Sequence, residues 1–331
     1  MYQHKLSKKS TIVIEDLSNS AQKMLQKAAE KNLSFSPQMN RCMANDFFIR
    51  HAGVSEQMEK VENFFVVTDN YEIPARRYVP TNIVSDGIIL FAHGGGWIQG
   101  NLDTHDYLCR KIAKILEIEV IAMDYRLAPE FMFPIPLEDF CCAYQWCINT
   151  FVGKKIILAG DSAGGNLCAA LCVKLANEMS HFRPHVQVLF YPVLSNDFSS
   201  PSYDAYDNRA LTKIGTMASL SWYVGKSCLE KDVMSNTLVY PLLQKDMSIF
   251  PRTVLIPAQC DILLDGQLSF AEKLQAAGTK VDIIQTNGTI HGFMTYGKEF
   301  EDEITHVLEE IKKLEFIEEK NEYSKNISKT Y

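Results

Sequence analysis

Residues 155–177 read KIILAGDSAGGNLCAALCVKLAN and contain a G-x-S-x-G motif centred on Ser162. The motif separates an apolar segment, residues 156–159, from residues 166–176, whose composition favours a helix. Glycines two positions before and after the serine let the backbone turn sharply and expose the serine at a helix N-terminus. The stretch therefore predicts a nucleophile elbow between a strand and a helix. The alternative is a glycine-rich turn with an incidental serine, since the odds of one chance match are on the order of 10%.

Short apolar segments alternate with helix-length segments on both sides of this turn. Because these strands are too hydrophobic to face water, we expect an α/β fold with a mostly parallel sheet covered by helices on both faces. Residues 61–68 and 72–79 predict an antiparallel hairpin at a sheet edge, with Asp69 and Asn70 in the turn. Further strands are expected at residues 88–93, 119–124, 155–160, 186–191, 251–257 and 280–285, and helices near residues 103–116, 136–149, 164–177, 267–277 and 298–314.

Three parts of the chain lack this alternation. Residues 1–55 predict helices, one over residues 21–32 and a second that starts at Pro37. Residues 195–247 form an insertion after the sixth strand, with a helix near residues 212–224, and residues 318–331 form a polar tail. We therefore expect one α/β domain over residues 56–317 that contains the insertion.

Composition and charge exclude several classes of protein. The 331 residues are 47% hydrophobic and 22% charged, as is typical of a globular protein with a large core. Lys and Arg number 33 against 40 Asp and Glu, a net charge of −7, so we expect no nucleic-acid partner. No apolar run approaches the roughly 18 residues of a transmembrane segment, and the N-terminal stretch lacks a signal-peptide pattern.

The nine cysteines are scattered along the chain without a C-x-x-C pair. No histidine lies at zinc-ligand spacing from them, so we expect no metal site. Their odd number and their apolar neighbours favour free, buried thiols in a reducing compartment. We expect a cytoplasmic protein that uses no cofactor.

A second glycine-rich loop follows the strand expected at residues 88–93. It reads His93-Gly94-Gly95-Gly96-Trp97. Three consecutive glycines leave their N–H groups unshielded, so these groups can point at an oxyanion together with the N–H of Ala163, which follows the serine. A flexible loop or a phosphate-binding turn is the alternative, although Gln99 stands where a dinucleotide-binding fingerprint needs glycine.

Ser162 needs a general base, because a hydroxyl is a poor nucleophile at neutral pH. With a G-x-S-x-G serine, the chain order is serine, acid, histidine, and both partners follow late strands. His291 fits this order, since it lies in a glycine-rich loop, residues 287–293, directly after the last expected strand. The other histidines after the serine come too early in the chain or lie in a charged helix: His181, His185 and His306.

The acid that orients the histidine has two candidates after the strand expected at residues 251–257. Asp261 lies in the loop that follows this strand. Asp265 lies four residues later, where we expect a structural role as the N-cap of a helix. We therefore favour Asp261 over Asp265.

Five motifs occur in one order from about residue 60 to 315: HGGGW at residues 93–97, DYRLAPE at 124–130, GDSAGG at 160–165, the segment 261–265 and HGF at 291–293. Together they resemble the hormone-sensitive-lipase-like family of α/β-hydrolases, which includes bacterial acetyl esterases and carboxylesterases. The resemblance implies an eight-stranded sheet and a helical cap built from the N-terminal helices and the insertion. It implies a catalytic triad of Ser162, Asp261 and His291. It also implies an oxyanion hole formed by Gly94, Gly95, Gly96 and Ala163. Ile262 departs from the proline that usually follows the acid in the family.

The expected function is a serine carboxylic ester hydrolase that acts on small to medium acyl esters. Trp97, Tyr191 and Phe293 lie beside motif residues, so they are candidates for the substrate pocket, with ordinary core packing as the alternative. A different function on the same fold is a non-catalytic small-molecule receptor, as in the gibberellin receptors, which lack the catalytic histidine. An amidase or arylformamidase is a third possible function, since these enzymes use the same acyl chemistry. A homodimer is compatible with the sequence.

For other residues near the motifs, a structural role is the first expectation. Arg126 and Glu130 are expected in an ion-pair network behind the glycine loop. Asp161 could tune the site electrostatically, although a carboxylate at a helix N-terminus is already stabilising. The Met and Phe side chains of residues 39–48 either line a face that admits substrate or pack against the domain.

Overall fold

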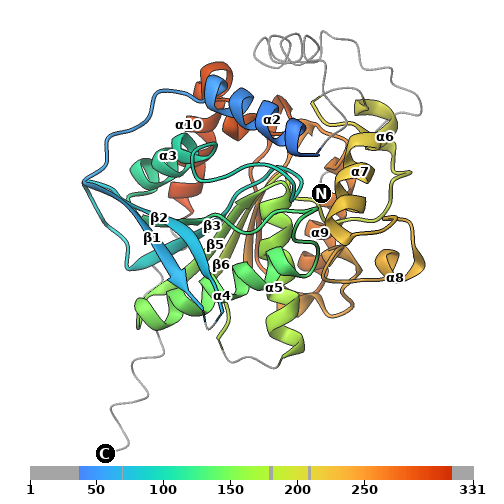
Figure 1. Cartoon of the computed structure of the whole chain (residues 1–331), viewed down its shortest axis with the longest axis horizontal. Helices are drawn as coiled ribbons and strands as arrows, with labels where there is room; N and C mark the ends of the chain where they lie inside the picture. Colours follow the sequence, from blue (N-terminus) through green and yellow to red (C-terminus); the bar gives the residue numbers. More distant parts are fainter. Residues whose placement is uncertain (1–36, 69, 179–181, 208–209, 315–331) are drawn as a thin grey trace, which may run out of the picture.

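The computed structural model describes residues 37–68, 70–178, 182–207 and 210–314 (Figure 1). The helix expected at residues 21–32 and the polar tail at residues 318–331 lie outside the described residues. The helix expected from Pro37 is confirmed as α2 (Pro37–His51).

An eight-stranded sheet forms the centre of the domain, in the order β1-β2-β4-β3-β5-β6-β7-β9. Its strands are β1 (Lys60–Val67), β2 (Glu72–Val79), β3 (Gly87–Ala92), β4 (Glu119–Met123), β5 (Lys155–Asp161), β6 (Val186–Phe190), β7 (Arg252–Ile256) and β9 (Val281–Ile283). β1 and β2 form the expected antiparallel hairpin at one edge, and β2 runs antiparallel to β4. All other pairings are parallel, which confirms the mostly parallel sheet.

Helices cover both faces of this sheet. α3 and α10 pack together on one face, while α4 and α5 lie on the other (Figure 1). Every residue of β3 and β6 is buried, which explains why these strands are apolar without alternation. The helices begin and end close to the expected positions: α3 (Asp106–Leu116), α4 (Ile135–Thr150), α5 (Ala163–Asn177), α9 (Leu264–Ala276) and α10 (Gly297–Lys313).

Among its described residues, the insertion after β6 contains the α-helices α6 (Pro201–Tyr206), α7 (Lys213–Val224) and α8 (Lys231–Met234). α7 is the helix expected near residues 212–224, and its N-cap Thr212 accepts the N–H of Gly215 at 3.0 Å. α6 and α8 have only six and four residues, too short for a helical period to show in the sequence.

Two further strands, β8 (Ala258–Cys260) and β10 (Thr286–Ile290), pair in parallel as a separate small sheet. The sequence prediction of a glycine-rich loop over residues 287–293 is therefore wrong for its first half. Gly288 has a φ of +67°, and the register shifts between Thr286 and Ile290. This irregular strand has no alternation of apolar and polar residues, and for that reason its sequence reads as a loop.

The small sheet places the ends of two distant segments together. Ile290 pairs with Cys260 in its register. Asp261 and His291 are the next residues of the two strands, so parallel pairing brings them side by side. Among the helices that the structure describes, none has the length and apolar character to cross a membrane.

Candidate active site

Ser162 lies in a strained turn between β5 and α5. Its φ of 53° and ψ of −115° are unusual for a residue with a side chain, a conformation that costs on the order of 1–3 kcal/mol and is concentrated at functional sites. The turn is tight enough to need glycine at position 164, because a Cβ there would lie 2.0 Å from the carbonyl oxygen of Ala92. The sequence-predicted strand–turn–helix around Ser162 is therefore present.

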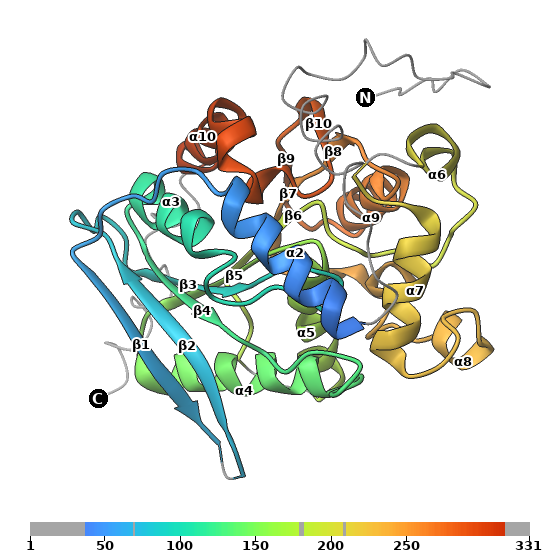
Figure 2. The same ribbon diagram turned by 45° about the horizontal axis from the view of Figure 1, so that its top comes forward.

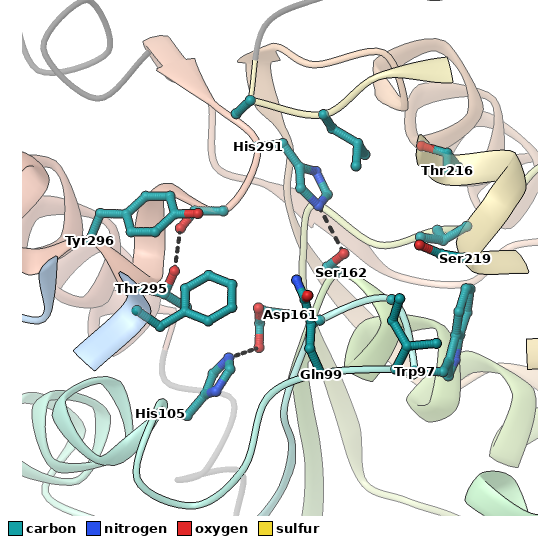
Figure 3. Close-up of a pocket in the computed structure, with 18 residues that line it drawn as sticks. Trp97, Gln99, His105, Asp161, Ser162, Thr216, Ser219, His291, Thr295 and Tyr296 are labelled. Carbon is teal, nitrogen blue, oxygen red and sulfur yellow. Dashed lines mark hydrogen bonds and ion pairs between the residues drawn. The ribbon is translucent and has the colours of Figure 1, made fainter. Parts of the chain in front are cut away.

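Ser162, His291 and Asp261 form a continuous chain of polar contacts. Ser162 Oγ lies 2.8 Å from His291 Nε2 (Figure 3), and His291 Nδ1 lies 2.7 Å from Asp261 Oδ2. The Asp261 side chain is fully buried, and its other oxygen accepts the N–H of Leu263 at 3.0 Å. A carboxylate can only accept, so the proton of a neutral His291 resides on Nδ1. Nε2 is then free to accept the hydroxyl proton of Ser162.

The rival residues considered from the sequence lie elsewhere. His185 precedes β6 and donates its backbone N–H to Ile156 at the start of β5, at the opposite end of the sheet from Ser162. His306 lies within α10, and His181 is outside the described residues. The expected N-cap role of Asp265 is wrong, because α9 begins one residue earlier. Its carboxylate instead accepts the N–H of Ser202 at 2.7 Å.

The glycine loop offers fewer oxyanion donors than the sequence suggests. The N–H of Gly94 donates to Asp161 Oδ1 at 2.8 Å, so Gly94 is not available as a donor, contrary to expectation. Gly95 and Gly96 have positive φ values of 109° and 61°, and both line the cavity beside Ser162. Ala163 is the first residue of α5, so its N–H has no acceptor within the helix. Three amides next to Ser162 therefore remain as candidate donors.

A cavity of about 160 Å³ opens in front of Ser162 and His291 (Figure 3). Trp97 lines it, as expected, and its indole stacks on Tyr223 of α7 with ring centroids 4.4 Å apart. Tyr191 and Phe293 are fully buried and do not line the cavity, so their expected pocket role is wrong. The centroid of the Tyr191 ring lies 5.0 Å from that of the His291 ring and 5.6 Å from that of the Phe293 ring. Both side chains lie in the core, where Tyr191 packs against the His291 ring and Phe293 packs against Tyr191.

Several cavity residues carry no signal in the sequence. They come from the loop between the glycines and α3, from α7 and from the segment before α10: Ile98, Gln99, His105, Thr216, Ser219, Thr295 and Tyr296. His105 Nε2 lies 3.2 Å from Asp161 Oδ1, the same oxygen that accepts Gly94 N–H (Figure 3). Asp161 thus links the elbow to the glycine loop and to the residue before α3. Phe48 of α2 also lines the cavity, and it belongs to the segment, residues 39–48, that the sequence suggests for this role.

Arg126 and Glu130 both form ion pairs, as the sequence suggests, and each pairs with a different residue. Arg126 Nη2 lies 2.6 Å from Asp139, whose side chain is fully buried. Glu130 lies 2.7 Å from Arg41 of α2, far away in the sequence. The DYRLAPE segment therefore connects α4 and α2 to the region of the glycine loop.

Comparisons with known proteins agree with this fold and geometry. Residues 89–295 match a protein family described as alpha/beta hydrolase fold. The carboxylic ester hydrolase LipN of Mycobacterium tuberculosis is 34% identical over 234 residues, which cover 67% of this chain and 61% of LipN, less than two thirds of its length. The ethyl acetate hydrolase of Pseudomonas putida is 29% identical over 260 residues, 76% of this chain and 81% of that protein.

A solved structure with the same fold is the ester hydrolase EH1AB1 from the metagenome of Lake Arreo, complexed with a bipyridine phosphonate derivative. It superimposes with a TM-score of 0.82 at 25% identity, over 91% of this chain and 98% of its own. The order of the motifs, the sheet topology and these relatives agree. The chain belongs to the hormone-sensitive-lipase-like family of α/β-hydrolases.

Proposed function

We propose that this protein is a serine carboxylic ester hydrolase that acts on small to medium acyl esters. The observation that carries the proposal is the contact chain Ser162–His291–Asp261, whose first two residues line the cavity. A serine with a histidine base and an orienting carboxylate is the arrangement that activates a hydroxyl for acyl transfer. Relatives named carboxylic ester hydrolase and ethyl acetate hydrolase support the same chemistry.

In the first half of the proposed reaction, Ser162 Oγ attacks the ester carbonyl carbon while His291 Nε2 takes the hydroxyl proton. Asp261 holds the imidazole in the required tautomer and stabilises the imidazolium that forms. The carbonyl oxygen becomes an oxyanion that the amides of Gly95, Gly96 and Ala163 are placed to stabilise. The C–O bond to the alcohol then breaks, and the alcohol leaves with the proton from His291.

In the second half, water replaces the alcohol. His291 takes a proton from water, whose oxygen attacks the acyl carbon of the Ser162 ester. The same amides stabilise the second oxyanion. The bond to Ser162 Oγ breaks, Oγ regains its proton from His291, and the carboxylic acid is released. Every step uses residues of this chain and no cofactor.

We infer that α2 and α7 act as the cap over the cavity. α2 contributes Phe48, and α7 contributes Thr216 and Ser219. The cavity of about 160 Å³ is small beside the ~300–1,000 Å³ of pockets that hold drug-sized ligands. This size favours acyl groups of a few carbons.

The rate profile across p-nitrophenyl esters from acetate to palmitate tests this proposal. We expect kcat/KM to be highest for short acyl chains and to fall beyond medium ones, because longer chains exceed the cavity. A maximum at palmitate would contradict the small-ester assignment. The matched pair p-nitrophenyl acetate and p-nitroacetanilide separates an esterase from an amidase, and the ester is expected to be the better substrate.

We infer a cytoplasmic location from the cysteines. All nine are free thiols, and six of them are buried: Cys109, Cys147, Cys168, Cys172, Cys228 and Cys260. Burial raises the pKa of Cys141, which is partly exposed, to about 11, so this thiol stays protonated near neutral pH. Unpaired thiols in this number are typical of a reducing compartment.

A further inference from the structure

One face of α2 contacts the glycine loop. Figure 2 shows α2 lying across the strand ends, from the side of α10 and α3 towards α7. Arg41, Asn45 and Phe48 are spaced four and three residues apart, so they share one face of the helix. Phe48 lines the cavity, whereas Arg41 and Asn45 make polar contacts to the backbone of the loop that follows the glycines.

These polar contacts hold backbone atoms on either side of Gln99. Arg41 Nε donates to the carbonyl of Ile98 at 2.6 Å, and its Nη2 donates to the carbonyl of Ala128 at 2.9 Å. Asn45 Oδ1 accepts the N–H of Gly100 at 2.9 Å. The two α2 side chains thus provide both a donor and an acceptor to the end of the loop.

The end of the loop is directly connected to Gly95. The N–H groups of Ile98 and Gln99 both donate to the carbonyl of Gly95, at 3.2 and 3.0 Å. The carbonyl of Trp97 accepts the N–H of Ala128 at 2.9 Å, so Arg41 spans two segments that are already bonded to each other. These bonds fix the peptide unit between Gly95 and Gly96, which carries the N–H of Gly96, so its orientation depends on a turn whose far end contacts α2.

Arg41 is itself held in place by Glu130. Its Nη1 and Nη2 donate to the two oxygens of this carboxylate at 3.2 and 2.7 Å. The hydrogen bond from Arg41 lowers the pKa of Glu130 to about 2, so the carboxylate is charged throughout the neutral range. A guanidinium with a paired carboxylate and two backbone carbonyls has little freedom to move.

We propose that Arg41 and Asn45 are positioning residues that hold the amides of Gly95 and Gly96 where the oxyanion forms. The inference rests on the ester-hydrolase function proposed above. Oxyanion donors act at 2.7–3.1 Å, and losing one costs about 10²–10³ in kcat. Without its contacts to α2, the loop keeps its glycines but no longer holds their N–H groups in the direction of the oxyanion. The transition state therefore loses more stabilisation than the bound substrate does.

The test compares Arg41→Ala and Asn45→Ala with Arg50→Ala in steady-state hydrolysis of p-nitrophenyl acetate. Arg50 is the matched control, because it lies on the same helix, has a side chain 73% exposed and pairs only with Asp46 among the described side chains. We expect each of the two variants to lower kcat by about 10- to 100-fold, with KM changed by less than about threefold. Arg50→Ala is expected to match the wild type. Asn45→Asp, which keeps an acceptor oxygen for Gly100, is expected to recover most of kcat.

Thermal unfolding of each variant separates this role from a loss of folded protein. If Arg41→Ala does not fold, the pair Asn45→Asp and Asn45→Leu gives the same comparison through the second contact. Unchanged kcat in folded Arg41→Ala and Asn45→Ala, or a rise in KM alone, would overturn the inference while leaving the ester-hydrolase function intact. No activity in the wild type and in Arg50→Ala would instead overturn the proposed function, and the inference with it.

Discussion

Replacing Ser162 with alanine is expected to lower kcat for p-nitrophenyl acetate by about 10⁴–10⁶-fold. The variant lacks the oxygen that attacks the ester and that lies 2.8 Å from His291 Nε2. Residual hydrolysis would come from binding and oxyanion stabilisation alone, which leave a small rate above that of water. Stopped or continuous absorbance assays with purified protein measure the loss.

Ser235→Ala is the matched control for this experiment. Ser235 is an exposed serine that directly follows α8 and does not line the cavity, and its hydroxyl donates to the carbonyl of Lys231 at 2.9 Å. We expect its removal to change kcat by less than about threefold, since no attacking oxygen is lost. A Ser162→Ala protein that hydrolyses the ester at the wild-type rate would exclude Ser162 as the nucleophile.

Asp261→Asn is expected to lower kcat by about 10⁴-fold while the protein remains folded. The carboxylate accepts the Nδ1 proton of His291 at 2.7 Å, whereas an amide can also donate to Nδ1. A donated hydrogen bond would favour the tautomer with its proton on Nε2, which cannot accept from Ser162. Steady-state rates from pH 6 to 9 and near-ultraviolet circular dichroism provide the measurement.

Asp265→Asn is the control that distinguishes the two acid candidates. Asp265 holds the start of α6 through the N–H of Ser202 and has no contact with His291 among the described residues. We expect this variant to keep kcat within about threefold of the wild type. The assignment of the acid would be reversed if Asp265→Asn lost activity and Asp261→Asn retained it.

Much of the fold follows from local sequence patterns. The apolar, alternation-free strands β3 and β6 are buried on both faces, and this burial is what makes the parallel sheet visible in the sequence. β10 could not be predicted, because Gly288 and a shifted register interrupt its periodicity. The position of His291 directly after this strand depends on pairing with β8, a non-local interaction that no local pattern encodes.

The site shows the same division between local and distant causes. The turn at Ser162 is encoded by its own glycines, Gly160 and Gly164, neither of which has room for a Cβ. The engagement of Gly94 by Asp161 joins residues 67 positions apart, so the sequence could not exclude Gly94 as a donor. Tyr191 and Phe293 adjoin motif residues, yet their side chains are buried in the core, where Tyr191 contacts both His291 and Phe293.

The contacts of α2 are the least predictable part of the site. Arg41 contacts Ile98 and Ala128 across 57 and 87 positions of sequence, and Asn45 contacts Gly100 across 55. Periodicity places Arg41, Asn45 and Phe48 on one helical face but does not say which loop that face meets. Only the folded arrangement identifies the glycine loop as their partner.

The central claim is that Ser162 is a nucleophile activated by His291, and covalent labelling with a fluorophosphonate tests it most directly. Intact-mass spectrometry of the folded wild type should show one phosphonyl group per chain, and peptide mapping should locate it on Ser162. The Ser162→Ala variant and heat-denatured wild type should remain unlabelled. The claim would be contradicted if the active wild type formed no adduct, or if the adduct lay on another residue and Ser162→Ala was labelled equally.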